Sequence, residues 1–450
     1  MRQRSTIRRR VRAWLAAAAA VAVGATACTA ASAAQPPASQ GRASQVPAVS
    51  ARPFGAADTA FGLGVLSAWC RSQPGSNIVF SPASLATGLG LAYLGARGRT
   101  AAAMAGALRL PVTAGPPLAA GLHARSAALG GLDRPGVTVA ASNRIWADPS
   151  LPPLRSYLNA AATGYGAGLW RVPLRSDPER ARRLINASIA CDTRSHIPDL
   201  PAPGSVNKDG WVLTDALYLD AGWATPFERA LTRPGMFTTA SGGLATPEFM
   251  HGGEYAYATA GGWTAVSLPY RGGKLAMTAL LPPAATGRAS AKIVEHCQVP
   301  SAATLSEVTG DLAGHDPGPA HGASQGANPP GIPARLTGIA LPEVNLSSHQ
   351  QMNGLLAGLG MGIAFAPGAD FTGLSPQAGS ISLVEHAATL AVGEKGTVGT
   401  AATAVGIMPS SLSIAPRHEI VFNRPYLMLV TDTATGEPLF LARVANPAAP

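Results

Sequence analysis

Hydrophobic positions recur along the chain with two different spacings. A spacing of three to four residues over 57–70 predicts an amphipathic helix. Further helices are predicted over 81–93, 100–108, 117–132, 178–191 and 350–360. Strand-like runs of apolar or alternating residues fall at 137–146, 211–219, 335–345 and 380–393. Between 254 and 281, two Gly-Gly pairs divide an apolar stretch and predict antiparallel strands joined by turns.

Helices and antiparallel strands follow one another in mixed order, which indicates an α+β fold. A chain of 450 residues is long enough for one large domain or two ordinary ones. No internal repeat occurs, and no linker-like stretch follows residue 55, so we expect a single domain over 55–447. Residues 311–334 are rich in Gly, Pro, Ala and His without periodicity, which predicts an exposed, mobile insertion.

The first 28 residues have the features of an export signal. Six arginines precede an apolar run from Ala13 to Ala27 that is too short for a convincing membrane span. The last four residues, ending at Cys28, resemble a bacterial lipoprotein cleavage site, although the usual Leu is absent. Cleavage by the ordinary signal peptidase near residues 31–33 is the alternative. Residues 29–54 are predicted to be a disordered Ala/Ser/Pro-rich tether, and we favour an extracellular protein with a lipid on Cys28.

Charge and cysteine content exclude several classes of function. The net charge is +10, and removal of the leader arginines leaves about +4, which does not indicate a nucleic-acid partner. If Cys28 is lipidated or removed, Cys70, Cys191 and Cys297 remain, so at least one free thiol is expected. No pair of cysteines or histidines has metal-ligand spacing. We therefore expect no metal and no cofactor.

A segment of small and β-branched residues runs from Gly396 to Thr403, directly after the alternating strand over 380–393. Such a segment can enter an existing sheet as a new strand, because its alternate side chains meet no steric hindrance. The side chains that share one face are Thr397, Gly399, Ala401 and Thr403.

With Glu394 before it, this segment closely resembles the proximal hinge of a serpin. Four further blocks resemble serpins in the right order, at residues 77–84, 213–219, 268–273 and 422–426. On these residues the chain is identified as a member of the serpin family, in an exported, bacterial form. The resemblance implies three β-sheets, about nine helices, an exposed reactive-centre loop, and an inhibitor that is not an enzyme.

The resemblance also implies a buried polar cluster under the centre of the main sheet, called the shutter, and a tryptophan at the top of that sheet. The matching residues are Ser81, Ser84, Asp215 and His386 for the shutter, and Trp223. Asp215 stands where the family usually has Asn, so a charge-assisted pair with His386 is expected. For the cluster itself we favour the shutter role, control of sheet opening, over a core network with no switching role. We do not expect sheet opening to be sensitive to pH. A serine-hydrolase triad is discounted, because Ser81 and Ser84 open an apolar helix.

In the serpin mechanism, a protease cleaves the exposed loop, which then inserts into the main sheet and traps the acyl-enzyme. The resemblance therefore implies a monomer that forms a covalent complex with a serine protease. Counting from Glu394 places the scissile bond after Ser410, counting back from Phe422 places it after Leu412, and Met408 is also in range. No Lys or Arg lies between 396 and 416, which favours an elastase-, chymotrypsin- or subtilisin-like target.

Two other classes of function remain as alternatives. A non-inhibitory serpin, acting as a binding or chaperone-like protein, usually carries bulky, charged or Pro residues in the hinge, and this chain has none. A hydrolase would rest on a G-x-S-x-G match at 322–326 and an S-x-x-K match at 205–208. The first lacks the strand and helix that a nucleophile elbow needs, and chance explains both matches better.

Overall fold

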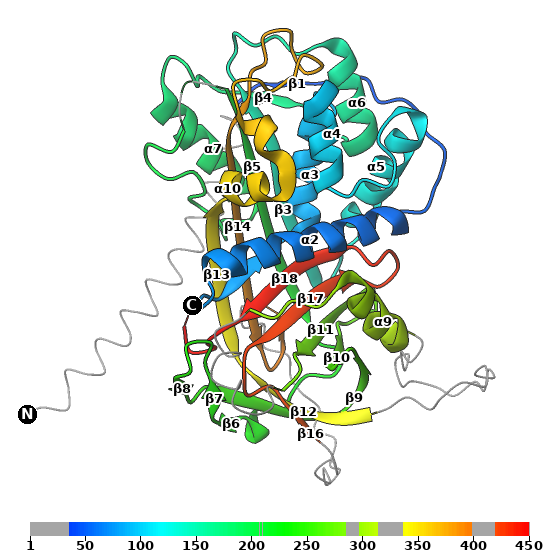
Figure 1. The fold of residues 1–450 in the computed structure, drawn as a ribbon, viewed down its shortest axis with the longest axis vertical. Helices are drawn as coiled ribbons and strands as arrows, with labels where there is room; N and C mark the ends of the chain where they lie inside the picture. The colour runs from blue at the N-terminus through cyan, green and yellow to red at the C-terminus, as the bar shows by residue number, and fades with distance from the viewer. Residues whose placement is uncertain are drawn as a thin grey trace, which may run out of the picture.

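The computed structural model describes residues 36–206, 208, 210–284, 297–313, 336–397 and 419–449. Within these residues, eight α-helices and three β-sheets form the α+β fold that the sequence predicts (Figure 1). Most helices gather around the upper half of the main sheet, and the second sheet lies across its lower half.

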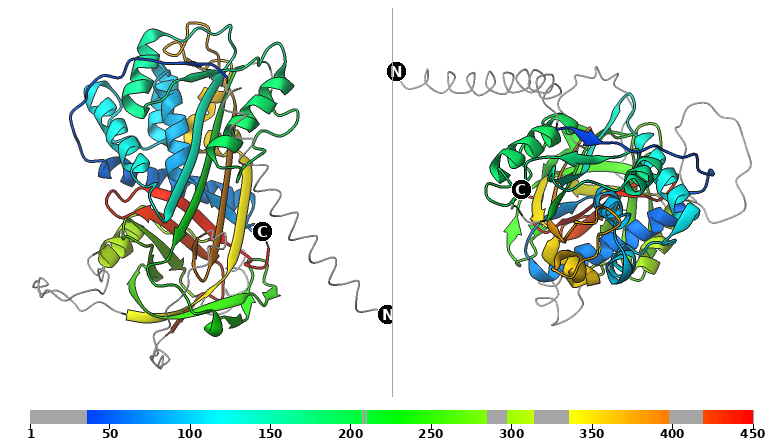
Figure 2. Two further views of the ribbon diagram at one scale, coloured as in Figure 1. Left: turned by 180° about the vertical axis from the view of Figure 1, so that it is seen from behind. Right: turned by 90° about the horizontal axis from the view of Figure 1, so that it is seen from above.

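The main sheet has seven strands in the order β1-β4-β3-β5-β15-β14-β13. Their bounds are β1 (Ala38–Ser39), β3 (Val137–Ala147), β4 (Leu169–Arg171), β5 (Trp211–Gly222), β13 (Val344–Gln351), β14 (Ile381–Gly393) and β15 (Gly396–Thr397). The long strands run side by side along the longest axis of the molecule (Figure 2). β3 is antiparallel to β5, whereas β5 and β14 are parallel and pair directly as far as Leu217 and Ala388.

Helices cover both faces of the main sheet, so its central strands are buried on both sides. On one face, α3 (Pro82–Tyr93) packs near Leu213 of β5. On the other face, α7 (Pro178–Asp192) packs near Val212 and Ala216. The other helices are α2 (Arg52–Ser72), α4 (Gly98–Ala107), α5 (Gly115–Gly130), α6 (Arg155–Tyr165), α9 (Ala302–Ala313) and α10 (Asn353–Leu356). Burial on both faces explains why the sequence of β5 is a continuous apolar run rather than an alternating one.

The second sheet has nine strands and is continuous through its longest strand, β9 (Glu248–Ala260). The others are β2 (Ile78–Phe80), β6 (Arg233–Pro234), β10 (Trp263–Pro269), β11 (Leu275–Leu281), β12 (Leu336–Pro342), β16 (Glu419–Val421), β17 (Tyr426–Asp432) and β18 (Pro438–Val444). The predicted turns at 261–262 and 272–273 join β9 to β10 and β10 to β11, with positive φ at all four glycines. β7 (Phe237–Thr238) and β8 (Leu244–Ala245) form the third sheet.

The N-terminal segment differs from the expected disordered tether over the part that the structure describes. β1 pairs antiparallel with β4 and so adds a strand to the edge of the main sheet. The chain then passes α6, where the Arg42 N–H donates to Asn159 Oδ1 at 2.8 Å and the Ser44 N–H donates to Thr163 Oγ1 at 3.0 Å. It continues to α2, which begins at Arg52 rather than at residue 57 (Figure 1).

The helix predicted over 350–360 is much shorter in the structure. α10 ends at Leu356, and irregular turns follow it to Phe365. Gly360 has a φ of 101°, a conformation that interrupts a right-handed helix. Of the predicted insertion over 311–334, only the first three residues are described, and they are the end of α9.

The prediction of a free thiol is wrong for the described cysteines, none of which is free. Cys70 of α2 and Cys297, which precedes α9, form a disulfide with a Cα–Cα distance of 5.6 Å. The two positions are 227 residues apart, so no local pattern could indicate the bridge. Among the described helices, none combines the length and hydrophobicity that a membrane span requires.

Candidate functional site

The first two residues of the predicted hinge already lie inside the main sheet. β15 sits between β5 and β14: Gly396 faces Gly222 and Gly393 in the register, and Thr397 faces Ala221 and Val392. Thr397 is fully buried. Because β5 and β14 pair directly farther down, β15 marks the point where the two strands have separated.

An aromatic pair covers this point. Trp223 stacks on Tyr270 with ring centroids 4.5 Å apart, and the Tyr270 hydroxyl is hydrogen-bonded to the Thr397 hydroxyl. Trp223 Nε1 donates to the Gly393 carbonyl at 2.9 Å, and its backbone N–H donates to the Lys395 carbonyl at 2.9 Å. Burial raises the pKa of Tyr270 far above its usual range, so its hydroxyl keeps its proton. Trp223 therefore contacts the turn that leads into β15.

Gly396 fits its position because it has no side chain. Its φ is 155°, and a Cβ atom added there would collide with the backbone carbonyl of Ala221. Any other residue would have to move β15 away from β5. The glycine therefore permits the close approach that brings Thr397 into the sheet.

Three charged side chains meet at the turn that leads into β15. Arg229, in the short helix η1 (Arg229–Leu231), places Nη1 2.5 Å from Glu394 Oε1 and 3.6 Å from Glu343 Oε1. Sequence reasoning found Glu394 but missed its two partners. No local pattern could have shown them, because Arg229 lies 165 residues from Glu394.

The four residues assigned to the shutter lie together beneath the centre of the main sheet. His386 Nδ1 lies 2.8 Å from Asp215 Oδ1, and the Ser81 backbone N–H donates to His386 Nε2 at 3.1 Å. Since Nε2 accepts a hydrogen bond, the imidazole is neutral and carries its proton on Nδ1. Ser84 donates its N–H to Ser81 Oγ at 3.0 Å and its hydroxyl to Asn143 Oδ1 at 2.5 Å.

This geometry does not suit a hydrolase triad. His386 bonds the backbone of Ser81 rather than its hydroxyl, and both residues are fully buried. A catalytic serine needs its hydroxyl beside the base and open to substrate. Asn143, on β3, is a member of the cluster that sequence reasoning missed.

Several predicted residues lie outside the described part of the chain. They are Gly399, Ala401 and Thr403 of the hinge, the candidate scissile-bond residues Met408, Ser410 and Leu412, and Cys28. The same holds for the G-x-S-x-G match at 322–326.

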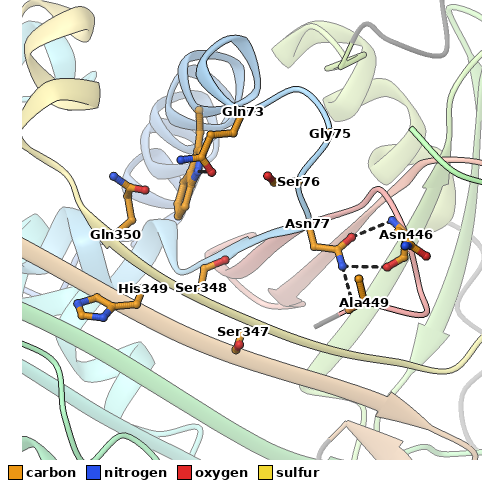
Figure 3. Close-up of a pocket in the computed structure, with 11 residues that line it drawn as sticks. Gln73, Gly75, Ser76, Asn77, Ser347, Ser348, His349, Gln350, Asn446 and Ala449 are labelled. Carbon is orange, nitrogen blue, oxygen red and sulfur yellow. Dashed lines mark hydrogen bonds between the residues drawn. The ribbon is translucent and has the colours of Figure 1, made fainter. Parts of the chain in front are cut away.

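A polar pocket of about 440 Å³ opens beside the edge strand β13, away from the hinge (Figure 3). Its walls come from the end of α2, the loop before β2, four residues of β13 and the C-terminal segment. Asn77 spans one wall and bonds the backbone of Asn446 and Ala449. No hinge or shutter residue lines this pocket, and no described group of three or more His, Cys, Asp or Glu side chains could hold a metal ion.

Comparison with known proteins identifies the family. The family model described as Serpin (serine protease inhibitor) matches residues 56–315 and 325–447. The chain belongs to the serpin family. It is 27% identical over 402 residues to the leukocyte elastase inhibitor of Sus scrofa, covering 87% of this chain and 99% of that protein. It is 30% identical over 405 residues to the putative serpin-Z6C of Oryza sativa subsp. japonica, covering 85% and 94%.

Solved structures share the fold of this serpin. The thermophilic serpin tengpin in its native state superposes with a TM-score of 0.74 at 21% identity, covering 92% of this chain and 100% of that one. Uncleaved ovalbumin superposes with a TM-score of 0.71 at 20% identity, covering 88% and 100%. These likenesses confirm the predicted serpin fold, and the family is one of protease inhibitors rather than catalysts.

Proposed function

We propose that this serpin is a suicide inhibitor of an extracellular serine protease with elastase-, chymotrypsin- or subtilisin-like specificity. The observation that carries the proposal is the position of β15 between β5 and β14, in register with both. After cleavage, residues that follow Thr397 would continue this strand down the sheet. Their side chains are small or β-branched as far as Thr403, so they offer no steric obstacle.

Full insertion would require β5 and β14 to separate where they now pair directly. The shutter pair spans these two strands, because Asp215 of β5 and His386 of β14 are register partners. Their hydrogen bond would have to break as the loop enters. The pair is therefore in a position to resist spontaneous opening of the sheet and to preserve the trapped native state.

The chemistry of the proposed trap is ordinary acyl transfer. The serine hydroxyl of the protease attacks the scissile carbonyl, the peptide bond breaks, and the new amine leaves with the proton. The ester that remains joins the protease to the N-terminal part of the loop. Insertion has to outpace hydrolysis of this ester, which makes any delay at the hinge costly to inhibition.

Two observations support an extracellular location. The arginine-rich leader has the features of an export signal. The Cys70–Cys297 disulfide is of a kind that persists in oxidising surroundings outside the cytoplasm. Attachment through a lipid on Cys28 remains part of the proposal and rests on the sequence alone.

A non-inhibitory binding or chaperone-like role is the alternative. It would not need a hinge that enters the sheet, whereas Gly396 and Thr397 pair with strands on both sides and the Thr397 hydroxyl is hydrogen-bonded. The hinge thus favours inhibition.

The test is incubation of the protein, freed of its leader, with elastase, chymotrypsin, subtilisin and trypsin. We expect a covalent band at the summed mass on a denaturing gel with at least one of the first three. Mass spectrometry of the released peptide then identifies the bond among Met408, Ser410 and Leu412. Cleavage of the loop by all of these proteases without any covalent band would move the function to the non-inhibitory alternative.

A further inference from the structure

At the turn before β15, one guanidinium faces two carboxyl groups. Arg229 Nη1 lies 3.6 Å from Glu343 Oε1 and 2.5 Å from Glu394 Oε1, so the two carboxyl groups lie beside the same cation. Two neighbouring carboxyl groups favour protonation of one of them, because two adjacent negative charges repel each other. The contacts at the hinge turn therefore place a titratable pair beside the start of β15.

Backbone contacts hold in place the segments that carry these side chains. The Phe227 N–H donates to the Glu394 carbonyl at 2.8 Å, which fixes the segment leading to Arg229 against the hinge turn. The Glu343 N–H donates to the Glu248 carbonyl at 2.9 Å, at the junction of β12 and β13. Movement of the hinge turn away from this junction would therefore separate the two carboxyl groups.

We propose that Glu343 is a positioning residue for the hinge: protonated, it holds Glu394 and β15 in the sheet, and deprotonated, it releases them. The proposal rests on the hinge role of β15 proposed above. With the proton present, Glu343 is neutral, and Arg229 balances the charge of Glu394. Without it, two adjacent carboxylates share one guanidinium and repel each other.

The charges around Glu343 place this change near neutral pH. Burial, and then the hydrogen bond and charge of Glu394, raise the pKa of Glu343 to about 7, with Arg229 opposing and Glu248 adding to the shift. For Glu394, burial raises the pKa, but hydrogen bonds from Arg229 and Glu343 outweigh it and leave the pKa lowered. Glu394 is therefore ionised throughout the range in which Glu343 titrates.

The direction of the pKa shift determines how pH affects the closed hinge. A raised pKa means that the proton favours the closed hinge, and this contribution is complete below the ordinary pKa of 4.5 and lost as pH rises through about 7. If Glu343 regains its ordinary pKa when the hinge opens, linkage predicts about tenfold more opening at about pH 8 than at about pH 6.

Hydrogen exchange read by mass spectrometry measures this opening without a protease. The reporting peptides cover the end of β5 and the hinge through Thr397, and peptides from β17 serve as an internal reference. Glu343→Gln is the matched control, because its amide still donates to Glu394 but does not titrate. Comparing the two proteins at each pH cancels the intrinsic pH dependence of exchange. Glu248→Gln alters a neighbouring charge and should keep the pH step.

We expect hinge protection in the unsubstituted protein to fall about tenfold relative to Glu343→Gln between about pH 6 and about pH 8. Parallel pH profiles for the two proteins would overturn the proposal. Covalent-complex formation is scored separately at both pH values. Covalent complexes without the pH step would refute the role of Glu343 and leave the proposed inhibitory function intact. The pH step without covalent complexes would support the role of Glu343 and refute the inhibitory function.

Discussion

His386 Nδ1 lies 2.8 Å from Asp215 Oδ1, in a hydrogen bond that joins β14 to β5 in the centre of the main sheet. The imidazole is held from its other side by the Ser81 N–H. A buried carboxylate with one hydrogen-bond donor depends strongly on that donor, because removal leaves the group unsatisfied. The shutter of this serpin is therefore a buried hydrogen-bond network that joins the two strands to the residue before α3.

We predict that His386→Ala costs roughly 3–5 kcal/mol, because it strands the Asp215 carboxylate and the Ser81 N–H. Asp215→Asn keeps an acceptor for Nδ1–H and removes the buried charge, so a change of about 1 kcal/mol or less is expected. The midpoint of the first transition in denaturant measures both. Equal losses for the two variants would show that the charge itself stabilises the sheet.

The side chain of Thr397 should decide whether the cleaved loop can insert into the main sheet. We predict that Thr397→Arg prevents insertion, because a guanidinium would have to be buried between β5 and β14 without a partner. The protease should then release cleaved protein, and the covalent fraction should fall by about tenfold or more.

Thr397→Ser is the control for this experiment, since it keeps the hydroxyl that bonds Tyr270 and adds no volume. It should form covalent complexes as the unsubstituted protein does. If Thr397→Arg also forms them, insertion does not begin at this residue, and the register of β15 has no functional meaning.

The sequence predicts features that depend on neighbouring residues, and it does not predict features that depend on contacts between residues far apart in the chain. The strand β5 and the turns that join β9, β10 and β11 could be predicted, because hydrophobic runs and Gly-Gly pairs are local signals. β1 was not, since two residues in an Ala/Ser/Pro-rich segment carry no periodicity, and its strand character comes from pairing with β4. The contacts of Arg229 and Glu343 with Glu394 could not be predicted either, because only the fold brings these residues together.

The Cys70–Cys297 disulfide ties α2 to the segment before α9 and closes a loop of 227 residues. We predict that its removal costs roughly 2–5 kcal/mol, because the unfolded chain gains the freedom that the bridge denied. Thermal unfolding with and without a reductant measures the loss. The paired variant Cys70→Ser with Cys297→Ser isolates this bridge, because the reductant also acts on Cys191, which is disulfide-bonded as well. Without reductant, the variant should already unfold at a lower temperature than the unsubstituted protein.

The segment before α2 should stabilise the edge of the main sheet. Its backbone pairs with β4, and the Arg171 N–H donates to the Pro37 carbonyl at 3.0 Å. We predict that removal of all residues before Arg52 accelerates hydrogen exchange in β4 and lowers the free energy of unfolding by roughly 1–3 kcal/mol. Gly41→Val is a single-site counterpart, because a side chain there collides with the backbone of Leu158. Unchanged exchange in both proteins would mean that the segment lies on the surface without supporting it.

Arg125 of α5 faces two buried carboxyl groups, Asp58 of α2 at 2.7 Å and Glu437 at 3.0 Å. Burial raises the pKa of Asp58 well above its ordinary value, with Arg125 opposing and Glu437 adding to the shift. A raised pKa stabilises the fold below the ordinary value of 3.8, and this contribution is lost as pH rises through the raised pKa. The side-chain amide that Asp58→Asn introduces is neutral at every pH, as the protonated Asp58 carboxyl is at low pH. We therefore predict that the melting temperature of Asp58→Asn falls less with rising pH than that of the unsubstituted protein.

Glu179→Gln is the control, because it alters an exposed ion pair and should leave the pH profile unchanged. Identical profiles for Asp58→Asn and the unsubstituted protein would contradict a proton shared within this cluster.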